Sequence, residues 1–96
     1  MIRAVITPGK LVLQGHAHCG TRGTDIVCAA VSILTETLAR SLPEGWARLA
    51  QGFAEFCYPE EPPEVSFVLR GLRLLETNFP EAVQVTPSAR MDEGCR

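Results

Sequence analysis

Alternation of apolar and polar residues opens the chain and predicts a β-hairpin. Residues 2–7 and 10–16 both alternate with a period of two, and Pro8 and Gly9 lie between them. Proline and glycine suit the centre of a tight turn, because proline fixes φ and glycine accepts a positive φ. We therefore expect two antiparallel strands joined by a short turn.

The alternation also predicts which hairpin residues are buried. If Thr7 pairs with Lys10, one face of the hairpin collects apolar side chains and the other becomes more polar. Strict alternation places His16 on the polar face unless Gly15 forms a bulge. The residues expected on the buried face are Ala4, Ile6, Leu11 and Leu13.

A helical period of apolar residues begins after an irregular, glycine-containing stretch at residues 17–24. It predicts a helix over about residues 26–40, for which Thr24 and Asp25 offer N-caps. At 100° per residue, the expected core stripe consists of Ile26, Val27, Ala30, Val31, Ile33, Leu34 and Leu38.

Cys28 lies outside that stripe, beside Ser32 and Thr35 on the helical projection. A cysteine used only for structure usually behaves as a small buried hydrophobe. We therefore expect the Cys28 side chain to point away from the apolar face of its own helix.

A second helix is predicted over residues 64–78, with Pro62 and Pro63 at its start. Its apolar arc is wider than one packing face requires, so we expect one side to pack on a sheet and the other on a partner subunit. The arc consists of Val65, Phe67, Val68, Leu69, Gly71, Leu72, Leu74, Leu75 and Phe79.

The remaining apolar segments predict three more strands. Residues 46–50 and 53–58 form an aromatic-rich hairpin, residues 83–85 form a last short strand, and residues 86–96 form a loose tail. The order ββαββαβ predicts an α+β fold with two layers, in which two helices pack on a small mixed sheet. We expect one domain over residues 1–85, followed by the tail.

Composition narrows the class of protein. The chain has 96 residues, of which 46% are hydrophobic and 21% charged, as in a soluble globular domain. A domain of this size has a thin core and gains from dimerisation. The net charge is -2 and Lys10 is the only lysine, so we expect no nucleic-acid partner.

The sequence also suggests a compartment. No window approaches the roughly 20 apolar residues of a membrane span, and the N-terminus lacks the apolar run of a signal peptide. We therefore expect a cytoplasmic protein with no membrane partner. In the cytoplasm the four cysteines should be free thiols. They are Cys19, Cys28, Cys57 and Cys95.

Both histidines and two of the cysteines lie within residues 15–32. One interpretation is a nucleophile with its base. A thiolate at Cys28, in the first turn of a helix, would be stabilised by backbone N–H groups and the helix dipole, and His16 could take its proton. The alternative is that neither residue takes part in a reaction, so that Cys28 is a small thiol at a helix start and His16 is a surface histidine.

A metal site is the other chemical interpretation of this stretch. His16, His18, Cys19 and Cys28 are residue types that bind zinc. The spacing is poor, because no Cys-x-x-Cys pair is present and the adjacent side chains of His18 and Cys19 diverge. We expect no metal and no other cofactor.

The sequence around these residues resembles the ribosomal-processing cysteine protease (Prp) family. The resemblance rests on residues 15–17 (GHA), residues 25–32 (DIVCAAVS) and the interval between His16 and Cys28. Residues of the second helix also resemble the family's C-terminal portion. The presence of His18 and Cys19 departs from the family pattern, which has a glycine and a small or aromatic residue there.

The resemblance implies a small α+β homodimer that trims a short N-terminal extension from a large-subunit ribosomal protein. It implies Cys28 as the nucleophile and His16 as the base. Asp25 is then either the N-cap of the helix, which we favour, or the group that orients His16. Ser32 either lines the site or bonds to the preceding turn, and Gly15 and Gly23 support the loop. A non-catalytic ribosome-associated or protein-interaction module of the same fold is the alternative.

Overall fold

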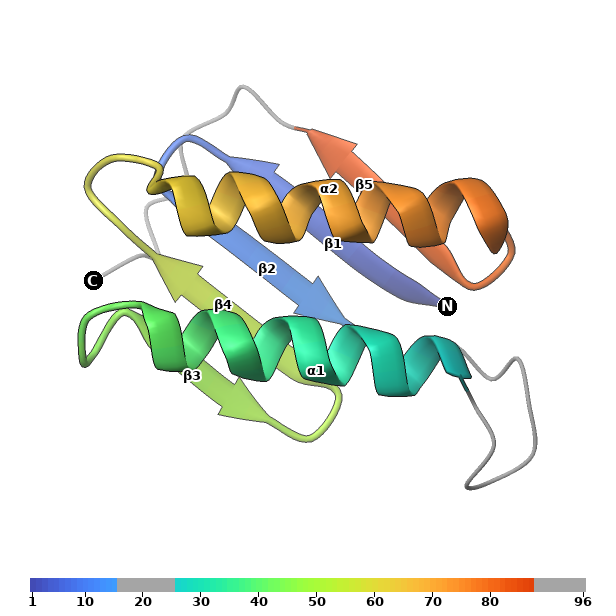
Figure 1. The fold of residues 1–96 in the computed structure, drawn as a ribbon, viewed down its shortest axis with the longest axis horizontal. Coiled ribbons are helices and arrows are strands. Elements are labelled where there is room, and N and C mark those ends of the chain that lie inside the picture. The colour runs from blue at the N-terminus through green and yellow to red at the C-terminus, as the bar shows by residue number, and fades with distance from the viewer. Residues whose placement is uncertain (16–25, 88–96) are drawn as a thin grey trace.

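The computed structural model describes residues 1–15 and 26–87, and its elements follow the predicted order ββαββαβ. The five strands form one sheet with the order β3-β4-β2-β1-β5. Both helices cover the same face of this sheet and run in opposite directions (Figure 1). The predicted two-layer α+β fold is therefore confirmed. The elements are β1 (Ile2–Thr7), β2 (Lys10–Gln14), α1 (Ile26–Ser41), β3 (Ala47–Ala50), β4 (Phe53–Cys57), α2 (Pro63–Asn78) and β5 (Val83–Pro87).

The first hairpin has the predicted register. Thr7 pairs with Lys10 across the turn, and the pairs that follow bring the four expected apolar residues to the face beneath the helices. Gly9 has φ +86°, a backbone conformation that residues other than glycine rarely adopt. The turn residues therefore set the register, and the register sets the buried face.

The second strand of this hairpin is shorter than predicted. β2 ends at Gln14, because Gly15 adopts φ +103° and its N–H donates to the carbonyl of Gly52 at 2.9 Å. A Cβ at Gly15 would collide with the backbone carbonyl oxygen of Met1. Only glycine fits here without a shift of the neighbouring backbone. The face predicted for His16 lies outside the described residues.

The last strand is longer than predicted. β5 pairs in parallel with β1, and this register continues through Thr86 opposite Val5 and Pro87 opposite Ile6. Thr86 and Pro87 therefore belong to the sheet, although the sequence placed them in the tail. Residues 88–96 of the predicted tail lie outside the described residues.

The buried face of α1 differs from the predicted stripe. Ile26 and Ile33 are each 64% exposed, whereas Thr35 is buried. The apolar arc of α1 is wider than its contact with the sheet, and the helix is turned so that the flank nearer Cys28 faces the core. The buried residues are Val27, Val31, Thr35 and Leu38.

This rotation also corrects the expectation for Cys28, because the residue is partly buried and packs against the hydrophobic core. Burial of Thr35 is compatible with its hydroxyl, which donates to the backbone carbonyl of Ser32 at 3.0 Å. A buried polar group costs little once it is hydrogen-bonded.

α2 begins as predicted, with Pro62 at the N-cap and Pro63 as its first residue. It packs on the sheet through Val65, Val68 and Leu72, which are the residues of this helix that are buried. α2 approaches α1 closely at Gly71, where a Cβ would lie 3.2 Å from two methyl carbons of Leu34.

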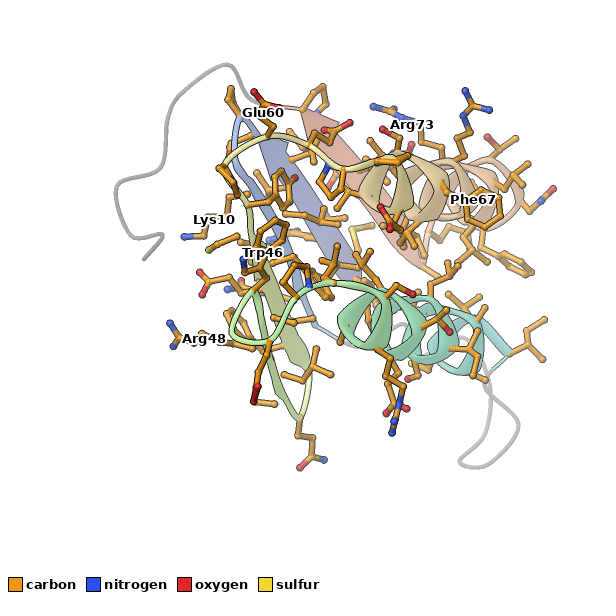
Figure 2. All side chains as sticks on the ribbon, turned by 60° about the vertical axis from the view of Figure 1, so that its left-hand side comes forward. Lys10, Trp46, Arg48, Glu60, Phe67 and Arg73 are labelled. Carbon is orange, nitrogen blue, oxygen red and sulfur yellow. The ribbon has the colours of Figure 1, made fainter. Side chains whose placement is uncertain are left out.

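Part of the apolar arc of α2 faces outward. Phe67 is 77% exposed and Leu74 is 64% exposed, and Figure 2 shows Phe67 on the outer surface of the helix. The predicted excess of apolar surface on α2 is therefore present.

The opposite face of the sheet carries charged residues. Lys10 Nζ lies 2.9 Å from Glu55 Oε2, and Arg48 contributes a second contact to the same carboxylate at 3.3 Å. Lys10 and Arg48 project from the side of the sheet that the helices leave open (Figure 2). Across residues 1–15 and 26–87, no helix is long and apolar enough to cross a membrane.

Candidate active site

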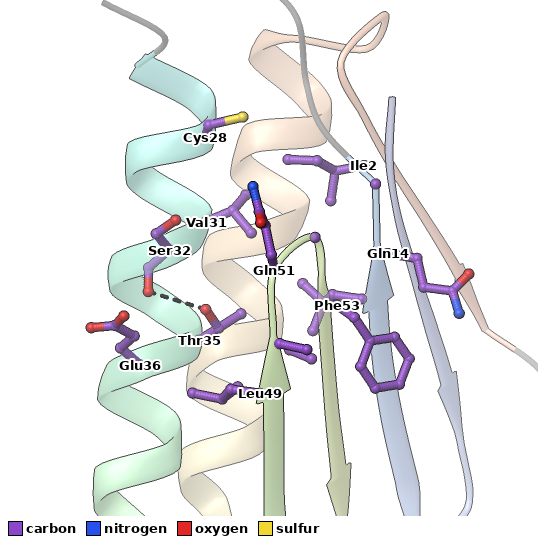
Figure 3. Close-up of a pocket in the computed structure, with 15 residues that line it drawn as sticks. Ile2, Gln14, Cys28, Val31, Ser32, Thr35, Glu36, Leu49, Gln51 and Phe53 are labelled. Carbon is purple, nitrogen blue, oxygen red and sulfur yellow. Dashed lines mark hydrogen bonds between the residues drawn. The ribbon is translucent and has the colours of Figure 1, made fainter. Parts of the chain in front are cut away.

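A cavity of about 300 Å³ lies between the N-terminal half of α1 and the β3–β4 hairpin. Figure 3 shows α1 as one wall and the hairpin as the other, with the ends of β1 and β2 beyond them. The wall formed by α1 consists of Cys28, Val31, Ser32, Thr35 and Glu36.

The spacing of these helix residues explains why they share a wall. Ser32 lies four residues after Cys28, and Glu36 lies four residues after Ser32, so the three occupy successive turns on one side of the helix. Their common face is the one that Cys28 was predicted to share with Ser32 and Thr35. The structure confirms this grouping, but it divides the face: Cys28 and Thr35 turn toward the core, whereas Ser32 and Glu36 are exposed at the rim of the cavity.

Cys28 lies at the start of α1. The helix begins at Ile26, so Cys28 is in its first turn, and its thiol, which is not disulfide-bonded, is partly buried at the cavity. Backbone N–H groups in the first turn of a helix have no acceptor within that helix, and the helix dipole places partial positive charge there. The arrangement can stabilise a thiolate and bind an oxyanion.

Ser32 lines the cavity, which is one of the two roles expected for it. Its backbone carbonyl accepts the hydrogen bond of Thr35, and Figure 3 shows this bond along the cavity wall. The hydrogen bond fixes the rotamer of Thr35 at the edge of the core. The buried hydroxyl of Thr35 is therefore satisfied within α1 itself.

The hairpin wall combines apolar and amide groups. Phe53 and Leu49 line the cavity from the two strands, and Gln51 extends from the turn between them toward α1 (Figure 3). Phe56 and Tyr58 of the aromatic-rich hairpin are buried in the core. Phe53 is one of the residues around the cavity, but Figure 3 shows its ring directed away from α1, on the side of Gln14.

Sequence reasoning missed several cavity residues. Glu36 carries a detectable signal, because it follows Cys28 by eight residues and so returns to the same side of the helix. Leu49 and Gln51 carry no such signal. Their place in the cavity depends on the order of strands in the sheet, which brings residues distant in sequence next to α1.

The predicted site residues divide into two groups. The structure brings Gly15, Cys28 and Ser32 to one cavity. His16 and Asp25 lie outside the described residues, together with Gly23, His18 and Cys19. In the described part of the chain, no group of three or more metal-binding side chains comes together.

The expectation of four free thiols is wrong for Cys57, which is disulfide-bonded. Cys57 ends β4 and pairs with Lys10 on the side of the sheet opposite the helices, away from the cavity. The expectation rested on the inferred compartment, which carries no information about which sulfur atoms the fold brings together. Cys19 and Cys95 lie outside the described residues.

A two-layer α+β fold with a thiol at a cavity is compatible with a cysteine protease. A comparison with protein families identifies this class. The family model described as cysteine protease Prp matches residues 1–84. The chain belongs to the cysteine protease Prp family, as the resemblance of residues 15–17 and 25–32 predicted. Its enzyme class, cysteine protease, is thereby confirmed.

Solved structures share the same fold. The S. aureus ribosomal processing protease Prp, in a crystal structure with a covalently linked product peptide, is 21% identical and has a TM-score of 0.77. That alignment covers 92% of this chain and 100% of the other. The crystal structure of SMU.848 from Streptococcus mutans is 26% identical, with a TM-score of 0.74, and covers 94% and 99% of the two chains.

A third structure, the S. aureus protease with a substrate peptide, is 18% identical with a TM-score of 0.73, and covers 92% of this chain and 100% of that chain. Among curated proteins, none is significantly similar to this chain.

Proposed function

We propose that this cysteine protease removes a short N-terminal extension from a large-subunit ribosomal protein in the cytoplasm. The observation that carries the proposal is the thiol of Cys28 at the start of α1, which is not disulfide-bonded and lines a cavity large enough for part of a peptide. Support for the substrate comes from the S. aureus relatives, which are ribosomal processing proteases with bound peptides.

In the proposed mechanism, His16 takes the proton of the Cys28 thiol and the resulting thiolate attacks the scissile carbonyl carbon. N–H groups at the start of α1 donate to the oxyanion that forms. His16 then gives its proton to the leaving amine as the C–N bond breaks. Water, deprotonated by His16, hydrolyses the thioester and restores the thiol.

The other predicted residues support this pair. Asp25 directly precedes α1 and is proposed as its N-cap, which would fix the direction of the first-turn N–H groups. Orientation of His16 is its alternative role. Ser32 lines the cavity beside the reacting groups. Gly15 allows the sharp turn that precedes His16, and Gly23 supports the loop before α1.

The test is incubation of the protein with the extended ribosomal protein, followed by intact-mass measurement. The wild type should release the extension, and Cys28→Ser and His16→Ala should each abolish the release without altering the fold. Cys19→Ser is the matched control, because it makes the same atomic change at a cysteine that the proposed mechanism does not use and should leave cleavage intact.

An unchanged substrate mass with the wild type would favour the non-catalytic interaction module. Release by Cys28→Ser at the wild-type rate would exclude Cys28 as the nucleophile.

We further propose a homodimer formed through the helical face. Its support is the set of large apolar side chains that α1 and α2 leave exposed, since small domains gain stability by burying such surface. These side chains are Ile26, Ile33, Phe67 and Leu74.

Sedimentation of charge variants tests the dimer. Phe67→Glu and Leu74→Glu should each lower the mass toward that of a monomer. Arg73→Glu is the control, because Arg73 lies on the other flank of α2 and should leave the mass unchanged (Figure 2). A monomeric wild type at micromolar concentration would contradict the proposal.

A further inference from the structure

Glu36 is the one charged side chain among the described residues that line the cavity. It is exposed at the rim, while the remaining walls are apolar or neutral. Figure 3 shows its carboxylate on the outer side of α1, one turn after Ser32. A single carboxylate at the edge of a neutral cleft would attract a cation rather than an anion.

The distance from Glu36 to the thiol suits a peptide substrate. Cys28 and Glu36 are eight residues apart on α1, which is about 12 Å along the helix at 1.5 Å per residue. An extended peptide advances about 3.3 Å per residue, so this distance corresponds to three or four peptide residues. The cavity follows α1 over this whole length.

The wall opposite Glu36 favours an extended peptide. β3 is an edge strand, and the N–H of Cys57 donates to the carbonyl of Trp46 at 2.9 Å. Antiparallel pairs alternate, so Arg48 and Ala50 turn their backbone groups toward β4. The N–H and C=O groups of Leu49 then point toward the open edge, where a peptide strand can pair with them.

We propose that Glu36 is a specificity residue that binds a lysine or arginine side chain of the substrate, three or four residues from the scissile bond. The inference rests on the proposed function in that Cys28 marks the scissile bond. An extended peptide passes Glu36 once, so the preference for a basic residue falls on one side of the bond only. Arg40, four residues along α1, competes with the peptide only weakly, as exposed helical pairs do.

The experiment compares peptides that carry a single lysine or a glutamine at the third or fourth position on either side of the cleavage site. We expect the wild type to cleave one lysine peptide about two- to fivefold better in kcat/KM than its glutamine counterpart, the range for exposed ion pairs. Glu36→Gln should remove this preference, and Glu36→Lys should transfer it to a glutamate peptide.

The matched control is Glu60→Gln. It makes the same charge change at an exposed residue beyond the opposite end of β4, outside the cavity (Figure 2). This variant should keep the lysine preference. The preference should also shrink as salt is raised, because exposed charge pairs are screened, whereas a purely structural role for Glu36 would show no such dependence.

A second measurement separates this inference from the proposed function. The affinities of Cys28→Ser for the lysine and glutamine peptides should differ by the same two- to fivefold, and Glu36→Gln added to that variant should equalise them. If the wild type cleaves no peptide but this difference appears, the proposed protease mechanism fails and the role of Glu36 stands. Equal affinities, or a lysine preference that survives Glu36→Gln, would overturn the inference.

Discussion

α1 and α2 have the same length, sixteen residues, and cover the same face of the same sheet, yet they contribute differently to the molecule. α2 buries three aliphatic residues and contributes none of the residues that line the cavity. α1 buries a threonine, and its first half leaves a cavity against the β3–β4 hairpin.

The contrast shows how one helix can carry both the residues that pack on the core and the proposed nucleophile. Val27, Val31 and Leu38 attach α1 to the core, while the adjacent turn positions carry Cys28 and Ser32. Because both sets repeat every turn, the packing residues fix the rotation of the helix and so fix the direction of the thiol. α2 contributes no residue to the cavity, and the apolar residues Phe67 and Leu74, which do not pack on the sheet, are exposed.

The largest expected effect is on the packing face of α2. Leu72→Ala removes a fully buried side chain from the core and should cost about 2–5 kcal/mol of unfolding free energy. Thermal unfolding should then shift down by roughly 10 °C or more. Ser32→Ala, on the cavity face of α1, should change stability by less than about 0.5 kcal/mol. Equal shifts for the two variants would remove the distinction between the helices.

A smaller effect is expected at Gly15, which closes the cavity beside β2. Gly15→Ala combines a positive φ with a collision against the carbonyl of Met1, and should cost about 1–3 kcal/mol. Gly45→Ala is the control, since Gly45 has φ +90° with no atom within 4 Å of the added Cβ. Chemical denaturation should show the greater loss for Gly15→Ala, and equal losses would mean that the Met1 contact is unimportant.

The smallest effect is expected at Tyr58, in the packed end of the sheet away from the cavity. Its hydroxyl is buried without a hydrogen-bond partner, and burial, aided by the Glu61 carboxylate, raises the pKa of Tyr58 well above its usual value. Tyr58→Phe should therefore leave stability near neutral pH within about 0.5 kcal/mol or raise it slightly.

The pH dependence of stability in the wild type and in Tyr58→Phe gives a sharper test. Above about pH 10, tyrosine ionises in the unfolded chain while buried Tyr58 stays neutral, so the wild type should lose stability as the pH rises. Tyr58→Phe should lose less over the same range. Parallel stability curves for the two proteins from pH 9 to 11 would contradict the raised pKa.

Much of the fold could be predicted from sequence because its signals are local. The Pro8-Gly9 turn predicted the register of the first hairpin, and the apolar periods predicted both helices to within one residue at each end. The rotation of α1 could not be predicted in this way. Its apolar arc is wider than the contact it makes, and only the position of the sheet decides which flank is buried.

Only the part of the candidate site that lies on α1 could be predicted from the sequence. Residues 25–32 led to Cys28 and Ser32 as candidates, both of which line the cavity, and helical spacing extends the same face to Glu36. The hairpin wall was not predictable, because Leu49 and Gln51 reach the cavity through strand order rather than through any local pattern. The disulfide at Cys57 likewise has no local signal in the sequence.

The central claim is that the thiol at the start of α1 is the reactive group of this protease. Its most direct test is alkylation with iodoacetamide at about pH 6.5, where ordinary thiols are mostly protonated, followed by mass mapping of the labelled cysteines. We predict that Cys28 is labelled first, and that activity is lost in step with its labelling. Labelling of Cys19 or Cys95 at the same rate as Cys28, or full activity after complete labelling of Cys28, would contradict the account.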